Sequence, residues 1–304
     1  MMGYMPEGAK RFYGMTGERL LRAMERGETV EGRVTLCDHR YNLHVTFGDG
    51  LYGIIPREES QYTDGEPIKD IAILTRVGKQ VAVKITDIHI TDGIPFFTLS
   101  RRAAQKECVE RYISGLCEGD IIPARVTHLE SFGAFVDIGC GICSLLPIDC
   151  ISVSRISHPM ERFSVGDNID IVVRGRDECG RVTVSMKELF GTWEENAALF
   201  SEGQTVRGIV RGIESYGIFV ELKPNLAGLA EWRGDVYEGD SAAVFIKAIL
   251  PEKMKVKLII IDSIDGGSEK EPPAYFVDTE RVRHIDRWEY SPRCCKKRIE
   301  TVFS

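Results

Sequence analysis

The sequence predicts an all-β fold of three tandem barrels joined by short helical connectors. The prediction depends on two observations. One pattern occurs three times along the 304 residues, and each occurrence holds about five short segments rich in β-branched and aromatic residues, separated by Gly, Asp and Asn. Five strands in roughly 70 residues favour a closed barrel, because an open sheet of that size would leave its edges unpaired. We therefore expect each repeat to be a five-stranded OB-fold.

Two glycine-led strands frame each repeat. The first begins at Gly27, Gly119 and Gly203, and the second at Gly78, Gly166 and Gly239. Apolar residues follow at alternating positions, which is typical of a half-buried strand. A short closing strand is expected at 97–99, 181–186 and 255–260. The shared order of these segments aligns the three repeats.

An aromatic pair with a spacing of three residues lies between these strands. The pair is Phe132 and Phe135 in the second repeat, Tyr216 and Phe219 in the third, and the degenerate Tyr41 and His44 in the first. Residues i and i+3 of a flat strand point to opposite faces, so the two rings need a bulge to share one face. We expect that bulge at Gly133 and Gly217, which can adopt positive φ, and at Asn42 in the first repeat.

Two rings on the outer face of a barrel form a platform on which unpaired bases can stack, at about 1–3 kcal/mol per base. Basic residues on the preceding strand are expected to contact phosphates; these are Arg125 and His128 in the second repeat and Arg207 and Arg211 in the third. The alternative is that the aromatic residues belong to the barrel cores. Recurrence around a glycine favours the platform in repeats two and three, whereas core packing is favoured for Tyr41 and His44.

The composition limits the classes of function. A net charge of −7 argues against indiscriminate duplex binding, although an acidic protein can carry a local groove for single strands. Nine scattered cysteines indicate reduced thiols, and the absence of a long apolar run or a signal-peptide pattern predicts a cytoplasmic protein with no membrane partner. We also expect a monomer.

Catalytic and metal-binding motifs are not evident in the sequence. Cys140 and Cys143 have a spacing that can hold zinc, but no second pair accompanies them, so plain reduced cysteines are the favoured interpretation. There is no nucleophile elbow, phosphate-cradling loop or metalloprotease motif. We therefore expect no enzymatic activity, no metal and no cofactor.

The repeats and the segments between them define the expected domains. They are an N-terminal helical lead (1–26), the first barrel (27–102), a connector helix (103–116), the second barrel (117–190), a connector (191–201), the third barrel (202–262) and a linker with a basic tail (263–304). The loop with Arg155 and His158 is expected to be solvated, with RNA contact as the alternative. The tail either binds RNA or a partner, or packs Phe276, Ile285 and Trp288 against the third barrel.

Residues 28–262 resemble the tandem OB-fold repeats of the bacterial ribosomal protein S1 family. Residues 131–137 (SFGAFVD) are close to the family's signature, and residues 215–221 (SYGIFVE) nearly so. The family has a histidine twelve residues beyond the second aromatic, and those positions hold Pro56, Pro147 and Glu231 here. The resemblance implies a protein that binds single-stranded RNA, in particular messenger RNA, in translation, with the small ribosomal subunit as a further partner. The alternative is a scaffold that docks on the ribosome or on an RNA-processing enzyme and binds RNA weakly.

Overall fold

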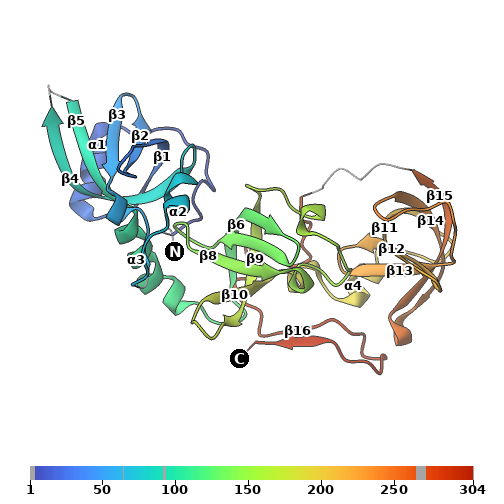
Figure 1. Cartoon of the computed structure of the whole chain (residues 1–304). Helices are drawn as coiled ribbons and strands as arrows, with labels where there is room; N and C mark the ends of the chain where they lie inside the picture. Colours follow the sequence, from blue (N-terminus) through green and yellow to red (C-terminus); the bar gives the residue numbers. More distant parts are fainter. Residues whose placement is uncertain (1–3, 64, 92–93, 265–271, 304) are drawn as a thin grey trace. The chain divides into compact units, whose positions relative to one another are not determined.

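Three closed five-stranded barrels make up most of the protein (Figure 1), which confirms the all-β prediction. The computed structural model describes residues 4–63, 65–91, 94–264 and 272–303. The strand orders around the barrels are β1-β2-β3-β5-β4, β10-β8-β7-β6-β9 and β11-β12-β13-β15-β14. In each barrel the third and fifth strands run parallel and close the sheet.

The strands have the following bounds. Barrel one contains β1 (Val30–Cys37), β2 (Leu43–Gly48), β3 (Leu51–Ile55), β4 (Gln80–Thr91) and β5 (Ile94–Ser100). Barrel two contains β6 (Ile121–Glu130), β7 (Gly133–Asp137), β8 (Cys143–Pro147), β9 (Asn168–Arg176) and β10 (Val182–Ser185). Barrel three contains β11 (Thr205–Glu214), β12 (Gly217–Lys223), β13 (Leu226–Ala230), β14 (Ser241–Leu250) and β15 (Lys255–Ile264), and a C-terminal hairpin is formed by β16 (Arg287–Glu289) and β17 (Glu300–Val302).

Short helices connect the strands. The α-helices are α1 (Gly17–Arg26), α2 (Asp70–Leu74), α3 (Arg101–Arg111) and α4 (Trp193–Ala197). The 3-10 turns are η1 (Arg57–Glu59), η2 (Ile113–Gly115), η3 (Ile148–Cys150), η4 (Pro159–Glu161), η5 (Lys187–Phe190) and η6 (Pro251–Lys253). A capping box opens α4, because Thr192 accepts from the Glu195 backbone while the Glu195 side chain accepts from the Thr192 backbone. Among the described residues, no helix is long and apolar enough to cross a membrane.

The same pair of backbone hydrogen bonds recurs in all three barrels. The N–H groups of Gly78, Gly166 and Gly239 donate to the carbonyls of Val34, Val126 and Val210, and each valine N–H donates back to the residue after the glycine. All six distances lie between 2.8 and 3.0 Å. The glycines have φ angles of 81°, 99° and 95°, which favour a residue without a Cβ. This shared geometry confirms the alignment made from the glycine-led strands.

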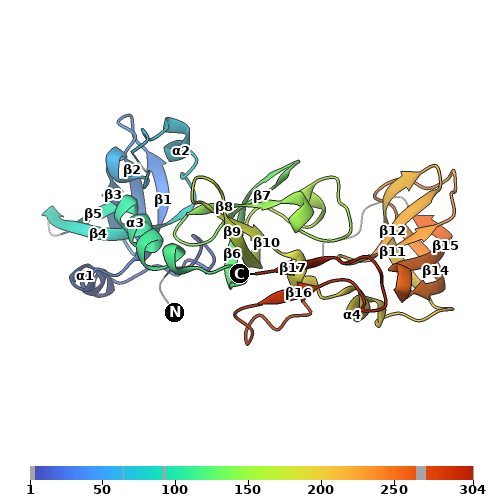
Figure 2. The same cartoon turned by 90° about the horizontal axis from the view of Figure 1, so that it is seen from below.

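The chain forms two compact units. Unit one comprises Met1–Leu116, Pro123–Arg125 and Asp137–Cys143; unit two comprises Cys117–Ile122, Val126–Val136 and Ser144–Ser304. In unit one, Leu20 of α1 is buried in the core of barrel one beside Phe47 and Phe97, whose rings meet edge to face at 6.1 Å. Figures 1 and 2 show the C-terminal hairpin of unit two alongside α4.

The C-terminal segment of unit two packs against both barrels of that unit. Trp288 and Tyr290 are buried in the core cluster of barrel three, while Phe303 is buried in a second cluster beside Ile121 and Val172 of barrel two. Ile285 packs on both clusters. Of the two interpretations of the tail, packing therefore describes Trp288 and Ile285.

Candidate nucleic-acid interface

The predicted aromatic pairs of barrels two and three have nearly identical geometry. The ring centroids of Phe132 and Phe135 lie 6.0 Å apart at an interplanar angle of 90°, and those of Tyr216 and Phe219 lie 6.1 Å apart at 88°. Phe132 is 53% exposed and Tyr216 is 66% exposed. Edge-to-face pairs of this kind are a favourable aromatic arrangement, and here each pair leaves ring surface open to solvent.

The bulge that was expected between the two rings lies elsewhere. Val210 pairs with Val220 and Gly212 pairs with Phe219, so the extra residue is Arg211 on β11. Tyr216 belongs to the two-residue turn before β12, and strand alternation does not apply to a turn residue. The two rings therefore share a side without a bulge at Gly217, and that expectation was wrong.

The glycine between the rings is required by the neighbouring strand instead. A Cβ at Gly133 would lie 2.5 Å from the carbonyl oxygen of Leu146, and a Cβ at Gly217 would lie 2.6 Å from that of Ala230. Gly217 has the expected positive φ, at 150°, but Gly133 is not among the described residues with positive φ. In both barrels the missing side chain lets the third strand pass directly beside the aromatic pair.

His128 joins the aromatic pair of barrel two. Its ring lies 6.3 Å from that of Phe135 at an angle of 29°, so the two rings are stacked. The Nε2 atom of His128 lies 2.7 Å from Glu130 Oε1, which orients the imidazole. We call His128, Phe132 and Phe135 platform two, and Tyr216 with Phe219 platform three.

Trp232 is a surface aromatic residue that the sequence analysis missed. The register of β12 and β13 pairs Phe219 with Leu229 and Ile218 with Ala230, and an extension of this register by two residues predicts that Trp232 lies opposite Tyr216. Trp232 is 60% exposed. The position of the family histidine is one residue earlier, at Glu231, and an extension of the hairpin register past the turn identifies the tryptophan.

The candidate pair of barrel one is arranged differently. Tyr41 has a φ of 63°, and the Arg57 guanidinium lies 4.7 Å from the centre of its ring. Arg57 is also paired with Asp70 at 2.6 Å. His44 Nε2 lies 3.5 Å from a carboxylate oxygen of Asp38, and the ring contacts of the described residues include none between Tyr41 and His44. The first repeat thus covers its aromatic ring rather than pairing it.

The predicted phosphate ligands occupy different environments. Arg207 is exposed and its Nε donates to Ser241 Oγ at 2.7 Å. Arg211 is only 8% exposed, because Glu161 and Glu221 both bind its guanidinium. Arg125 belongs to unit one, where its Nε lies 3.8 Å from the position a Cβ on Gly8 would take. His128 contacts a platform ring directly, because it stacks on Phe135.

The loop expected to be solvated is exposed at Arg155, but its following turn docks on barrel three. His158 Nδ1 accepts from Met160 N, which caps η4. Within the next turn, Glu161 binds Arg211, and Arg162 binds Glu221 through two hydrogen bonds of 2.7 and 2.5 Å. Arg155 thus agrees with the expectation, whereas Glu161 and Arg162 do not, because their partners lie 50 and 59 residues away in the sequence.

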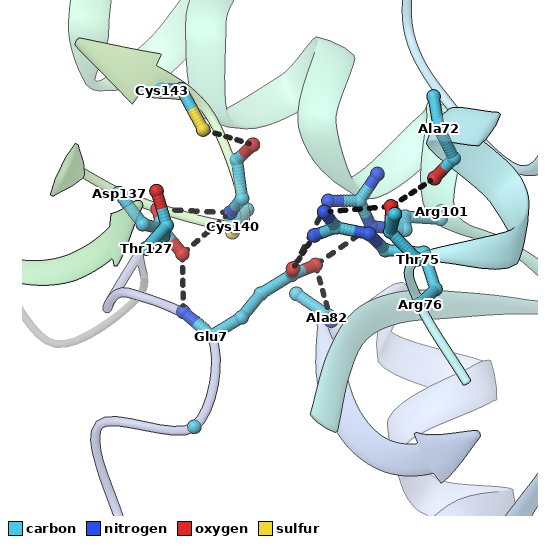
Figure 3. Close-up of polar contacts among 12 residues, drawn as sticks. Glu7, Ala72, Thr75, Arg76, Ala82, Arg101, Thr127, Asp137, Cys140 and Cys143 are labelled. Carbon is cyan, nitrogen blue, oxygen red and sulfur yellow. Dashed lines mark hydrogen bonds and ion pairs between the residues drawn. The ribbon is translucent and has the colours of Figure 1, made fainter. Parts of the chain in front are cut away.

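A buried ion cluster in unit one connects the N-terminal segment to α3 (Figure 3). The Glu7 carboxylate accepts two hydrogen bonds from Arg101, at 2.8 and 3.0 Å, and the Glu7 N–H donates to Asp137 at 2.7 Å. The Gly139 N–H also donates to Asp137. Burial and then the neighbouring Glu7 charge raise the pKa of Asp137 to about 7.

The hydrogen bonds of this cluster connect the segment at Glu7 with Arg101 and Asp137. Cys140 is buried beside Cys108, while Cys143 is exposed. Among the described residues, no group of three or more His, Cys, Asp or Glu side chains is placed to hold a metal ion.

Barrels two and three carry an exposed aromatic pair at the same hairpin, as expected from the resemblance to S1-type repeats. The S1 RNA binding domain family matches residues 116–187, which cover barrel two. The chain is similar to small ribosomal subunit protein bS1 of Rhizobium meliloti, with 29% identity over 214 residues that cover 70% of this chain and 37% of that protein. The resemblance of its repeats to those of ribosomal protein S1 is thereby confirmed.

Two further relatives agree with this assignment. The bS1 protein of Leuconostoc lactis is 32% identical over 157 residues, covering 50% of this chain and 36% of that protein. The bS1 protein of Staphylococcus aureus (strain COL) is 29% identical over 212 residues, covering 68% and 51%. The chain thus spans between about a third and a half of the length of these relatives.

Proposed function

We propose that this protein binds single-stranded RNA, including messenger RNA, through platforms two and three and acts in translation. The observation that carries the proposal is the matching pair of exposed edge-to-face rings in two S1-type barrels. Base stacking on such rings tolerates any base, so we expect little sequence preference. The relatives named as ribosomal proteins support the role in translation.

Phosphate contacts complete the proposed site. Arg207 is exposed on β11, the strand that pairs with the Phe219 strand, and Arg125 is half-buried on β6. Arg211 acts indirectly in our proposal, because its guanidinium is held by two carboxylates. Tyr41 and His44 contribute least, since Arg57 covers the Tyr41 ring.

Removal of all four paired rings tests the proposal. A variant with Phe132, Phe135, Tyr216 and Phe219 changed to Ala is expected to bind a single-stranded RNA of about 20 nucleotides more than about 100-fold more weakly at low salt, because at least four stacking surfaces are lost. Fluorescence anisotropy measures the affinity. Tyr13→Ala is the control, since Tyr13 is 86% exposed but belongs to no platform. Equal affinities for the quadruple variant and the intact protein would contradict the proposal.

The proposed partners and location follow from the same relatives. We propose a cytoplasmic, monomeric, non-enzymatic protein that associates with the small ribosomal subunit. Co-sedimentation with small subunits before and after ribonuclease treatment tests this association. Loss of co-sedimentation after ribonuclease indicates tethering through RNA, whereas its persistence indicates direct docking on protein.

A protein-docking scaffold is the second candidate function. It is favoured by the net charge of −7 and by the engagement of Arg162 and Arg211 in internal ion pairs, which leaves less positive charge for phosphates. Salt titration of RNA binding separates the two candidates, because the slope of affinity against salt reports the number of phosphate contacts.

A further inference from the structure

A single buried asparagine joins barrel three to barrel two within unit two. Asn225 lies in the turn between β12 and β13 and is 0% exposed. Its side-chain oxygen accepts from the Val153 N–H at 3.0 Å, and its side-chain nitrogen donates to the carbonyls of Lys187 at 2.7 Å and Gly191 at 2.9 Å. A buried amide with every polar atom bonded defines one arrangement of the segments that it connects.

The C-terminal hairpin bonds to the same junction. The Tyr290 hydroxyl donates to the backbone carbonyl of Asn225 at 2.7 Å, and the Trp288 indole donates to the carbonyl of Gly191 at 3.3 Å. The Trp193 N–H in turn donates to the carbonyl of Tyr290 at 3.0 Å. Both aromatic side chains are buried in the core cluster of barrel three.

A buried ion cluster forms a second bridge between the two barrels. Arg162, which follows η4 in barrel two, donates hydrogen bonds to both carboxylate oxygens of Glu221 on β12. Arg211 binds Glu221 at 3.0 Å and also binds Glu161. Glu221 is 5% exposed. Such pairs enforce a specific geometry, because separation of the barrels would leave buried charges without their partners.

Phe219 and Glu221 lie two residues apart on β12, so their side chains point to the same outer face of barrel three. The platform and the ion cluster therefore sit on one strand. A movement of barrel two relative to barrel three would displace Arg162 from Glu221 beside the platform itself. The position of platform three is thus coupled to the junction.

We infer that barrels two and three form one rigid, bivalent RNA-binding body, in which Asn225 is a positioning residue that sets the separation of the two platforms. We call Asn225, Arg162, Arg211, Glu221 and Tyr290 the inter-barrel lock. The inference rests on the proposed function and defines its ligand: one RNA strand long enough to reach both platforms. An RNA that reaches only one platform gains no affinity from the lock.

The expected consequence is a dependence of affinity on RNA length. When one platform is occupied, the second acts at an effective concentration set by the geometry of the connection, and the combined affinity can exceed that of one site by about 100-fold or more. A rigid connection keeps this gain in affinity. A loosened connection lets the second platform occupy many positions, which lowers its effective concentration.

The test compares the unaltered chain with Asn225→Ala and Tyr290→Phe. Asn225→Ala removes three side-chain hydrogen bonds, and Tyr290→Phe removes one while keeping the buried ring. Asn168→Ala is the matched control, because Asn168 is an exposed asparagine of barrel two. Anisotropy is measured with RNAs of about 6 and about 20 nucleotides, and NMR relaxation of the deuterated protein gives the rotational correlation time of each barrel without RNA.

The lock predicts one common correlation time for barrels two and three in the intact protein and two different times in Asn225→Ala. The variant is expected to bind the longer RNA about tenfold more weakly and the short RNA within about twofold of the intact protein, with Tyr290→Phe intermediate. Separate correlation times in the intact protein, or unchanged binding of the longer RNA by a variant whose barrels tumble separately, would overturn the inference. If neither RNA binds while the barrels tumble together, the lock stands and the proposed function fails.

Discussion

Barrels one and three place different residues at one register position, and this difference separates a covered ring from an exposed one. In barrel one the pairing of Leu43 with Ile55 continues to set Arg57 opposite Tyr41. In barrel three the corresponding position, two residues beyond the pairing of Ile218 with Ala230, is Trp232. The arginine caps the tyrosine face at 4.7 Å, whereas the tryptophan adds a further exposed ring. A repeated fold therefore repeats the position of a site without repeating its chemistry.

The largest difference in RNA affinity between the two barrels is expected when the aromatic pair of each barrel is removed in a separate variant. Tyr216→Ala with Phe219→Ala is expected to weaken RNA binding by about 2–6 kcal/mol, at least about 30-fold, because two bases lose their stacking surfaces. Tyr41→Ala with His44→Ala is expected to change the affinity less than about threefold, since Arg57 already covers the ring. Fluorescence anisotropy at constant salt measures both. Equal losses for the two double variants would show that barrel one binds RNA as barrel three does.

The fold was predictable from the sequence because the glycine-led strands depend on local backbone geometry. Gly78, Gly166 and Gly239 adopt positive φ, which the glycine pattern itself signals. The exposure of Tyr216 and the covering of Tyr41 were less accessible. The first follows from a turn rather than from strand alternation, and the second depends on Arg57, which meets Tyr41 only once the hairpin has formed.

Contacts between distant segments could not be predicted for a different reason. Arg211 is of a residue type that binds phosphate, but Glu161 and Glu221, which are distant from it or on another strand, form ion pairs with its guanidinium. The burial of Trp288 in the core of barrel three likewise depends on where the C-terminal hairpin docks. A pattern in one segment carries no information about which other segment will cover it.

Arg211 in barrel three and Arg57 in barrel one are expected to contribute different amounts to the free energy of unfolding. Arg211→Ala is expected to lower the free energy of unfolding of unit two by about 3 kcal/mol, because Glu161 loses its cationic partner and the buried Glu221 keeps only Arg162. Arg57→Ala is expected to cost less than about 1 kcal/mol, since its side chain is 41% exposed and its pair with Asp70 is screened by water. Urea unfolding followed by tryptophan fluorescence reports unit two, which contains all three tryptophans. Hydrogen exchange of barrel-one amides reports the second variant; similar costs for both would contradict the difference in burial.

Trp232 tests the register position directly. Trp232→Ala is expected to weaken binding of single-stranded RNA by about 1–3 kcal/mol, the contribution of one stacked base. Tyr237→Ala is a matched control for loss of an exposed aromatic residue in the same barrel, because Tyr237 is 68% exposed but lies outside the paired register. Anisotropy with an RNA of about 20 nucleotides measures both. A greater loss for Tyr237→Ala than for Trp232→Ala would exclude the register argument.

The buried ion clusters of the two units predict opposite responses to pH. Burial and Glu7 raise the pKa of Asp137 to about 7 from its ordinary 3.8, so the folded state binds the extra proton and the stability of unit one falls as pH rises from about 4 to about 7. Burial opposes the shift at Glu161, but hydrogen bonds from Ser157 and the charge of Arg211 lower its pKa. Its contribution to unit two is therefore present above its ordinary pKa of 4.5 and is lost as pH falls through the lowered value.

Urea unfolding at several pH values, followed by NMR signals of Gly139 for unit one and of the tryptophan indoles for unit two, measures these responses. Asp137→Asn is expected to remove the pH dependence of unit one between about pH 4 and about pH 7 and to leave unit two unchanged. A stability of unit one that rises over this range would show that Asp137 is held as a carboxylate by its backbone donors.

The smallest effect on RNA affinity is expected when barrel one receives the residue that barrel three has at this register position. Arg57→Trp gives barrel one the residue of barrel three, and its indole adds a stacking surface beside Tyr41, so we expect RNA binding to strengthen by about 1 kcal/mol or less. Arg57→Ala is the control, because it uncovers Tyr41 without adding a ring. If the alanine variant gains as much affinity as the tryptophan variant, release of the covered tyrosine is sufficient. If neither gains affinity, then the φ of 63° at Tyr41, rather than Arg57, keeps this ring out of the binding face.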